Sequence, residues 1–161
     1  MKMSVLYYSK SGNTKKMAEV IARGMQSVDG VEARTFPIEQ IDETWVKESR
    51  CVVLGTPTYY ADLAGTVKSF LENCKKYELA GKMGGAFATA EYLHGGGNIA
   101  IQTVLTHMMV MGMLTYSGGG AYGKPIIHQG PLAIMGRLEE SEETFRLYGQ
   151  RMASKAAELF R

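Results

Sequence analysis

Hydroxyl and amide side chains gather in one short stretch near the start of the chain, Ser9-Lys10-Ser11-Gly12-Asn13-Thr14. Ser9, Ser11, Asn13 and Thr14 each offer a hydrogen-bond donor that carries no positive charge. Gly12 permits a turn whose backbone N–H groups point inward, and a helix beginning near Asn13 would add the positive end of its dipole. The stretch is therefore suited to hold a phosphate, although an ordinary helix cap with polar turn residues has the same composition.

The spacing within this stretch favours one phosphate group over a chain of phosphates. A Walker loop requires GxxxxGK[ST] and a dinucleotide loop requires GxGxxG, whereas this stretch contains a single glycine. Lys10 lies in the middle of the loop, and we expect it to point to solvent. A phosphate monoester held by hydroxyl and amide groups agrees best with these residues.

Two later loops carry residues that a flat heteroaromatic ring would need. They read Gly55-Thr56-Pro57-Thr58-Tyr59-Tyr60-Ala61-Asp62 and Ala88-Thr89-Ala90-Glu91-Tyr92-Leu93-His94-Gly95-Gly96-Gly97. Aromatic or apolar side chains would cover the faces of such a ring, and backbone groups would bind its polar edge. The consecutive glycines would let the backbone come close to the ring.

Strand-like and helix-like runs alternate along the chain and would bring these loops together. We expect strands at residues 5–8, 31–36, 51–55, 83–90 and 113–116. The spacing of apolar residues predicts helices in four places. The first helix starts at an N-cap of Asn13 or Thr14, the next two span about 63–74 and 101–109, and the last begins near 139–141. Residues 117–137 read as a long connection containing Gly and Pro.

This alternation predicts a single α/β domain over residues 1–161. We expect a three-layer sandwich, in which a five-stranded parallel sheet of order 2-1-3-4-5 has helices on both faces. In that arrangement ligands bind beyond the carboxyl ends of the strands, where the strand order reverses. All three loops are expected at this edge.

Several segments of the chain resemble those of a known family. Tyr7-Tyr8-Ser9-Lys10-Ser11-Gly12-Asn13-Thr14, with Ala18 after it, resembles the FMN-phosphate signature of flavodoxins. Gly55-Thr56-Pro57-Thr58-Tyr59-Tyr60, with Ala64-Gly65 and Phe70-Leu71, is similar to tryptophan-repressor-binding-protein-like NAD(P)H:quinone oxidoreductases and NADPH-dependent FMN reductases. Gly95-Gly96-Gly97 and Gly112-Met113 continue this similarity, which covers roughly residues 2–122. The resemblance implies a flavodoxin-like fold and FMN as cofactor.

The resemblance also implies a role for each matching position. The phosphate loop would consist of Ser9, Ser11, Gly12, Asn13 and Thr14. A first ring-side loop would consist of Pro57, Thr58, Tyr59, Tyr60 and Ala61. A second ring-side loop would consist of Thr89, Ala90, Glu91, Tyr92, Leu93 and Gly95. Tyr59 and Tyr60 would stack on the ring or lie on the surface, and no catalytic side chain is implied because the flavin performs the chemistry.

Two features depart from the quinone reductases. Those enzymes carry a histidine before the Gly-Met of the fifth strand, where this chain has Val110-Met111. Either that contact near the flavin is missing here, or His94 or His107 replaces it. His107 is more typical of a structural histidine. The segments that build the family's tetramers are shorter here. We therefore expect a homodimer, with a tetramer as the second possibility, and we interpret the methionines of residues 108–113 as core or as a dimer interface.

The resemblance leaves two functions open. In the first, NAD(P)H reduces FMN, and the reduced flavin passes electrons to a quinone, a free flavin or another small acceptor. In the second, the protein is a flavodoxin-type electron carrier with no NAD(P)H oxidation of its own. Carriers are usually strongly acidic, whereas this chain has a formal net charge of +2, so the sequence favours the reductase. A response-regulator receiver is excluded because Tyr8-Ser9 and Thr56-Pro57 stand where its acidic residues would be.

The composition of the chain argues against several other kinds of site and location. The basic residues are scattered, which argues against a nucleic-acid surface. No run is long and apolar enough for membrane insertion, and no charged start precedes an apolar signal segment. Cys51 and Cys74 are far apart and read as small core residues in a reducing compartment, so we expect a cytoplasmic protein without a metal site.

Overall fold

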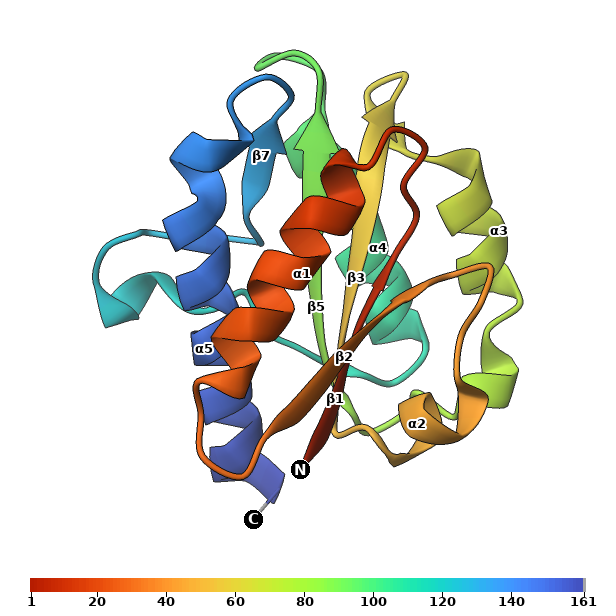
Figure 1. Ribbon diagram of the computed structural model, residues 1–161. Coiled ribbons are helices and arrows are strands. Elements are labelled where there is room, and N and C mark those ends of the chain that lie inside the picture. Colours follow the sequence, from red (N-terminus) through yellow and green to blue (C-terminus); the bar gives the residue numbers. More distant parts are fainter. Residues whose placement is uncertain (161) are drawn as a thin grey trace.

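A parallel β-sheet forms the centre of the protein, and helices cover both of its faces (Figure 1). The computed structural model describes residues 1–160. The strands are β1 (Lys2–Tyr7), β2 (Glu32–Pro37), β3 (Cys51–Tyr59), β4 (Asp62–Leu63), β5 (Met83–Ala90), β6 (Leu114–Thr115) and β7 (Leu132–Ile134). The α-helices are α1 (Asn13–Gln26), α2 (Glu43–Glu48), α3 (Gly65–Glu72), α4 (Gly97–Val110) and α5 (Glu142–Phe160). Short 3₁₀ turns occupy Lys75–Tyr77, Gly120–Tyr122 and Leu138–Ser141.

The sheet has the strand order β2-β1-β3-β5-β6, which confirms the predicted order 2-1-3-4-5. Parallel pairing sets Tyr7 beside Gly55 and Pro57 beside Thr89, so β1, β3 and β5 end at the same edge. All eight residues of β5 are buried, because helices cover both faces of this strand. Most of these side chains are small and make room for the helices. The larger ring of Phe87 occupies the space where a Cβ on Gly55 would be.

Three elements were given no bounds by the sequence-based expectations. The alternation of strands and helices implies a helix between β2 and β3 but gives it no bounds; α2 lies there, and Asp42 caps it by accepting a hydrogen bond from the Trp45 N–H at 2.9 Å. The strand β4 extends β3 into a hairpin, and β7 lies within the segment that we expected to be a connection. Because β6 pairs with the start of β5 and β7 with its end, two short strands share one position in the sheet.

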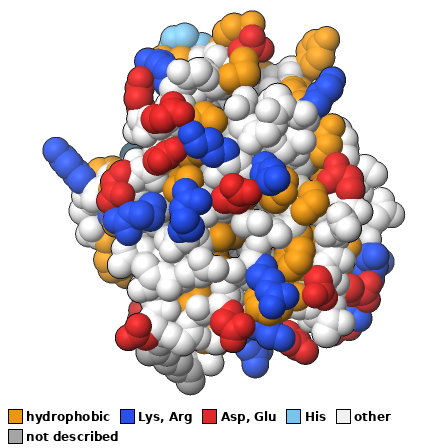
Figure 2. Space-filling view, viewed as in Figure 1, with side chains coloured by type: hydrophobic (Ala, Val, Ile, Leu, Met, Phe, Trp, Pro, Cys, Tyr) orange, Lys and Arg blue, Asp and Glu red, His pale blue; other side chains and the backbone are white. Residues whose placement is uncertain are grey.

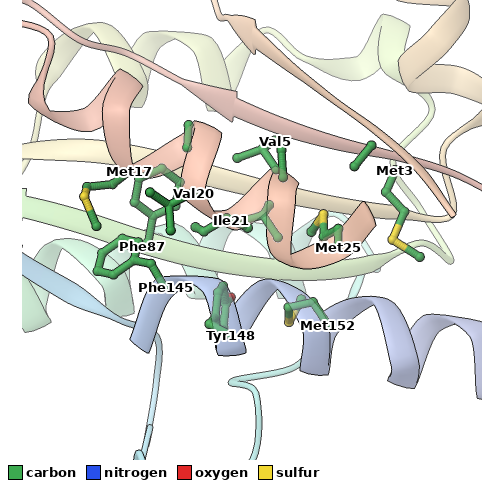
Figure 3. Close-up of a cluster of buried hydrophobic side chains, with 14 of the residues drawn as sticks. Met3, Val5, Met17, Val20, Ile21, Met25, Phe87, Phe145, Tyr148 and Met152 are labelled. Atoms are coloured by element: carbon green, nitrogen blue, oxygen red, sulfur yellow. The ribbon is translucent and has the colours of Figure 1, made fainter. Parts of the chain in front are cut away.

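Side chains from α1 and α5 form the core on one face of the sheet (Figure 3). Met17 and Ile21 of α1 and Phe145 and Tyr148 of α5 are buried against β1 and β5. The rings of Phe87 and Phe145 meet edge to face, with their centroids 5.7 Å apart. The helices α3 and α4 form a second core on the other face of the sheet, with Val67 and Val104 among its buried residues.

Candidate cofactor site

Three loops meet at the carboxyl edge of the sheet, at the top of the molecule in Figure 1. They are the loops after β1, β3 and β5, as predicted. Between them lies a cleft of about 180 Å³. The residues that line it are Lys10, Ser11, Asn13, Thr14, Pro57, Thr58, Tyr59, Thr89, Ala90, Glu91 and Met135.

The loop after β1 presents an open helix N-terminus to this cleft. Gly12, and not Asn13 or Thr14, is the N-cap of α1, with a left-handed φ of 93°. No side chain caps the first turn of the helix, so its N–H groups are available to an anion. The Gly12 N–H donates to Ser9 Oγ at 3.1 Å, which fixes the turn, and Asn13 Nδ2 donates to Ser11 Oγ at 3.3 Å.

Threonine side chains connect the three loops beneath the cleft. The hydroxyls of Thr14 and Thr89 are 2.8 Å apart and buried, and one donates to the other. The Thr58 hydroxyl donates to the Thr89 carbonyl at 3.0 Å. Thr14 lies in the first turn of α1, and Thr58 and Thr89 are the last residues but one of β3 and β5, so these bonds fix the relative positions of the loops.

The first ring-side loop is a tight hairpin between β3 and β4. Tyr59 pairs with Asp62, which leaves Tyr60 and Ala61 as the turn, with φ of 49° and 63°. Both are left-handed values that favour Gly or Asn, so the turn is strained. Tyr60 projects fully into solvent, whereas Tyr59 lies at the cleft. Partial burial and the neighbouring Tyr8 raise the pKa of Tyr59, so its phenol is neutral at physiological pH.

The second ring-side loop leans on the first. A Cβ on Gly96 would lie 2.5 Å from the Ala61 carbonyl oxygen, and Gly96 has a left-handed φ of 89°. A Cβ on Gly97 would meet the Leu132 side chain at 2.4 Å. In the structure these glycines therefore allow the two ring-side loops and β7 to pack closely. Tyr92 and Leu93 of the same loop are exposed at its tip.

The structure brings nine of the sixteen predicted site residues into the cleft lining: Ser11, Asn13, Thr14, Pro57, Thr58, Tyr59, Thr89, Ala90 and Glu91. The other seven lie in the same loops outside the lining: Ser9, Gly12, Tyr60, Ala61, Tyr92, Leu93 and Gly95. Ser9 and Gly12 shape the phosphate loop through their hydrogen bond.

Two lining residues were missed from the sequence. Lys10 is exposed, as expected, but it also borders the cleft. Met135 directly follows β7, and its N–H donates to the Ala90 carbonyl at 2.8 Å. The apolar run Leu132-Ala133-Ile134 between Pro131 and Gly136 is too short to show the period of a strand, so the sequence does not identify it as one.

Neither candidate histidine reaches the cleft lining. His107 lies on α4 with Nδ1 2.8 Å from the Thr103 carbonyl, a bond within its own helix. His94 is exposed in the second ring-side loop. Cys51 and Cys74 are free and buried, as predicted. Within residues 1–160, no group of three His, Cys, Asp or Glu side chains could hold a metal ion, and no helix could cross a membrane.

Comparisons with known proteins agree with this architecture. A family model described as a flavodoxin domain matches residues 4–96. A flavodoxin from Clostridium saccharobutylicum is 40% identical over 160 residues, which cover 99% of this chain and 100% of that protein. An NAD(P)H dehydrogenase (quinone) from Chromohalobacter salexigens is 25% identical, with 98% of each chain covered.

Solved structures share the fold at lower identity. A flavodoxin, WrbA-like protein from Agrobacterium tumefaciens matches with a TM-score of 0.81 and 24% identity, over 98% of each chain. Because the family model spans more than half of the sequence and a flavodoxin is 40% identical over nearly all of it, this chain belongs to the flavodoxin family, which implies FMN as its cofactor.

Proposed function

We propose that this protein is an FMN-binding electron carrier of the flavodoxin type. One observation carries the proposal: the open N-terminus of α1 and three hydroxyl-bearing loops converge on one cleft. The 40% identity to a flavodoxin supports a carrier over the reductase that the sequence favoured. We further propose that residues 1–161 act as one domain and that it works in the cytoplasm, since both cysteines are free and buried.

The chemistry of the cleft agrees with a phosphate monoester at one end. The uncapped N–H groups of α1, the Ser11 hydroxyl and the Asn13 amide are uncharged donors that suit an anion. Lys10 adds a positive charge at the border of the cleft. We assign phosphate binding to Ser9, Ser11, Gly12, Asn13 and Thr14. The same helix end would bind a carboxylate more weakly, because that group offers fewer acceptor oxygens.

The ring end of the site is assigned to the two ring-side loops. Bound FMN would supply the redox chemistry, because its ring takes up and releases electrons. Tyr59 and Pro57 would cover one side of the ring and exclude water from it. The backbone of residues 89–91 and the Thr58–Thr89 bond would orient it. Tyr60 and Tyr92, which are exposed beside the cleft, would meet a redox partner.

A second candidate is an NAD(P)H-dependent reductase that passes electrons to a quinone or a free flavin. The small positive net charge favours it, since carriers are usually acidic. Among the residues that line the cleft, Lys10 and Glu91 are the charged ones, and their charges balance. The relative described as an NAD(P)H dehydrogenase (quinone) also supports this candidate.

Two measurements test these proposals. First, FMN added to cofactor-free protein should lose its fluorescence as it binds, and unchanged fluorescence would overturn the FMN assignment. Second, the loaded protein should be mixed with NADH or NADPH without oxygen. A carrier keeps the absorbance of its oxidised flavin on this mixing and loses it only when dithionite is added. Rapid bleaching by NAD(P)H would instead establish the reductase.

A further inference from the structure

The segment that follows β7 closes one side of the cofactor cleft. Met135 is the first residue of this segment, and its N–H donates to the Ala90 carbonyl at 2.8 Å. Its side chain lines the cleft, and 43% of the residue is exposed. Because β3 pairs with one edge of β5 and β7 with the other, Tyr59 and Met135 lie on opposite sides of the loop after β5. The cleft therefore has a phenol ring on one side and a thioether on the other.

The side of the cleft that carries Met135 is also the side where α1 begins. Thr89 lies beside β7 in the sheet, and its hydroxyl is 2.8 Å from that of Thr14, in the first turn of α1. Farther along the same helix, Lys16 Nζ lies 2.8 Å from Glu139 Oε1, in the segment after β7. This segment therefore lies beside the helix N-terminus to which we assign the phosphate. Met135 is at the phosphate end of the cleft.

Several contacts hold the segment after β7 in place. Leu138 is buried in the same core as Met17 of α1. Lys16 also pairs with Glu142 at 3.1 Å, so two carboxylates that follow β7 are joined to the start of α1. The pairing of β7 with β5 fixes the other end of the segment. Met135 is thus part of a fixed wall of the cleft, because the chain on both sides of it is anchored.

The chain beyond Met135 is acidic. Four of the five residues from 139 to 143 are glutamates. Figure 2 shows acidic side chains gathered around the start of α5, with basic side chains between them. These four carboxylates pair with three cations, on Lys16, Arg137 and Arg146. The excess negative charge in this segment would repel a second phosphate brought to the same end of the cleft.

We propose that Met135 makes the cleft selective for a flavin that ends in a single phosphate over a flavin dinucleotide such as FAD. This inference rests on the proposed FMN function. In FMN the phosphate is the end of the molecule, whereas in FAD a second phosphate and an adenosine continue from it. The Met135 side chain offers no hydrogen-bond donor to a second phosphate, and its N–H is already bonded to Ala90. Selectivity therefore comes from what the site denies to the larger ligand.

Calorimetric titration of the cofactor-free protein with FMN and with FAD tests this assignment. The wild-type chain should bind FMN at least about tenfold more tightly than FAD. Met135→Ala opens the phosphate end, so it should tighten FAD binding at least about fivefold and change FMN binding less than about twofold. Met135→Leu keeps an apolar side chain of similar volume and should keep the wild-type preference.

Met109→Ala is the matched control for the loss of a partly exposed methionine. Met109 is 52% exposed but lies on α4 and does not line the cleft, so this variant should bind both flavins like wild type. If the wild-type chain binds FAD as tightly as FMN, or Met135→Ala gains no affinity for FAD, the role of Met135 is overturned while FMN binding stands. A wild-type chain that binds neither flavin would overturn the proposed function, and this inference with it. Near-ultraviolet circular dichroism confirms that each variant is folded.

Discussion

The hydroxyls of Thr14 and Thr89 lie 2.8 Å apart, although 75 residues separate them in the sequence. Both side chains are buried, so neither hydroxyl can exchange its partner for bulk water. Each hydroxyl has one proton to donate. If Thr89 donates to Thr14, the proton of Thr14 is free for a ligand in the cleft. This pair joins the phosphate loop to the second ring-side loop.

A double-mutant cycle measures this hydroxyl pair. Thr14→Val and Thr89→Val should each lower the free energy of unfolding by about 1–3 kcal/mol, because each leaves a buried hydroxyl without its partner. The double variant should cost little more than either single change, since no orphan hydroxyl remains. Urea unfolding provides the values. Thr66→Val, at an exposed position of α3, is the control and should stay within about 0.5 kcal/mol of wild type. Additive losses would show that the two hydroxyls act independently.

The phosphate assignment predicts a difference between two flavins. Ser11→Ala combined with Thr14→Ala should weaken FMN binding by at least about tenfold, because two uncharged donors to an anion are lost. Riboflavin, which lacks the phosphate, should bind both proteins almost equally. Fluorescence titration gives the four dissociation constants. Equal losses for FMN and riboflavin would mean that these side chains support the loop and do not contact the phosphate.

The strained turn of the first ring-side loop predicts a stabilising substitution. Ala61 has a left-handed φ of 63°, and its neighbour Tyr60 has one of 49°. Glycine adopts such angles without a steric cost, so Ala61→Gly should raise the free energy of unfolding by up to about 1 kcal/mol. Ala61→Val should lower it, because a β-branched side chain tolerates a positive φ least. Urea unfolding without cofactor checks both changes, and a loss of stability in Ala61→Gly would contradict the strain.

Close packing of α1 against α5 predicts two costly alanine substitutions. A Cβ on Gly24 would lie 2.0 Å from the Arg146 carbonyl oxygen, and one on Gly149 would lie 2.1 Å from the Ile21 carbonyl oxygen. Both obstacles are backbone atoms of a helix and cannot move aside cheaply. We expect Gly24→Ala and Gly149→Ala each to destabilise the protein by about 1–3 kcal/mol or more.

Gly65→Ala is the control for these helix substitutions. Gly65 also lies in a helix, α3, but a Cβ there would meet no atom within 4 Å. Alanine is the better helix former, so this change should be neutral or stabilising by up to about 1 kcal/mol. Thermal unfolding of the three variants separates the two effects. If all three glycines tolerate alanine equally, α1 and α5 do not pack as closely as the structure indicates.

Local sequence patterns were enough to predict the strand order and the position of the cleft. The strand at residues 83–90 was predicted with the bounds that the structure has, because its run of small apolar residues ends at Lys82 and Glu91. The loops that follow such strands must meet at one edge of a parallel sheet.

The remaining features depend on contacts that no local pattern records. Three residues, Leu132–Ile134, are too few to show a strand period, and β7 forms because β5 offers it a free edge. For the same reason Met135 was not predicted at the cleft. The left-handed turn at Tyr60 and Ala61 lacks the Gly or Asn that would have indicated it. The Thr14–Thr89 bond emerges only once the chain has folded.

The buried thiol of Cys51 predicts a loss of stability in alkaline solution. Burial raises the pKa of this thiol from 9.0 to about 12. Between these values the unfolded chain releases the Cys51 proton while the folded chain keeps it, so the unfolded state binds fewer protons and stability falls as pH rises. In Cys51→Ala the curve of unfolding free energy against pH should be less steep by about 1.4 kcal/mol per pH unit over this window. The small cavity in the variant shifts the whole curve without changing its slope. Urea titrations at several pH values between about 8 and 11 therefore distinguish the effect of the cavity from the effect of ionisation. Curves of equal slope would show that Cys51 ionises as easily in the folded protein as in the unfolded chain.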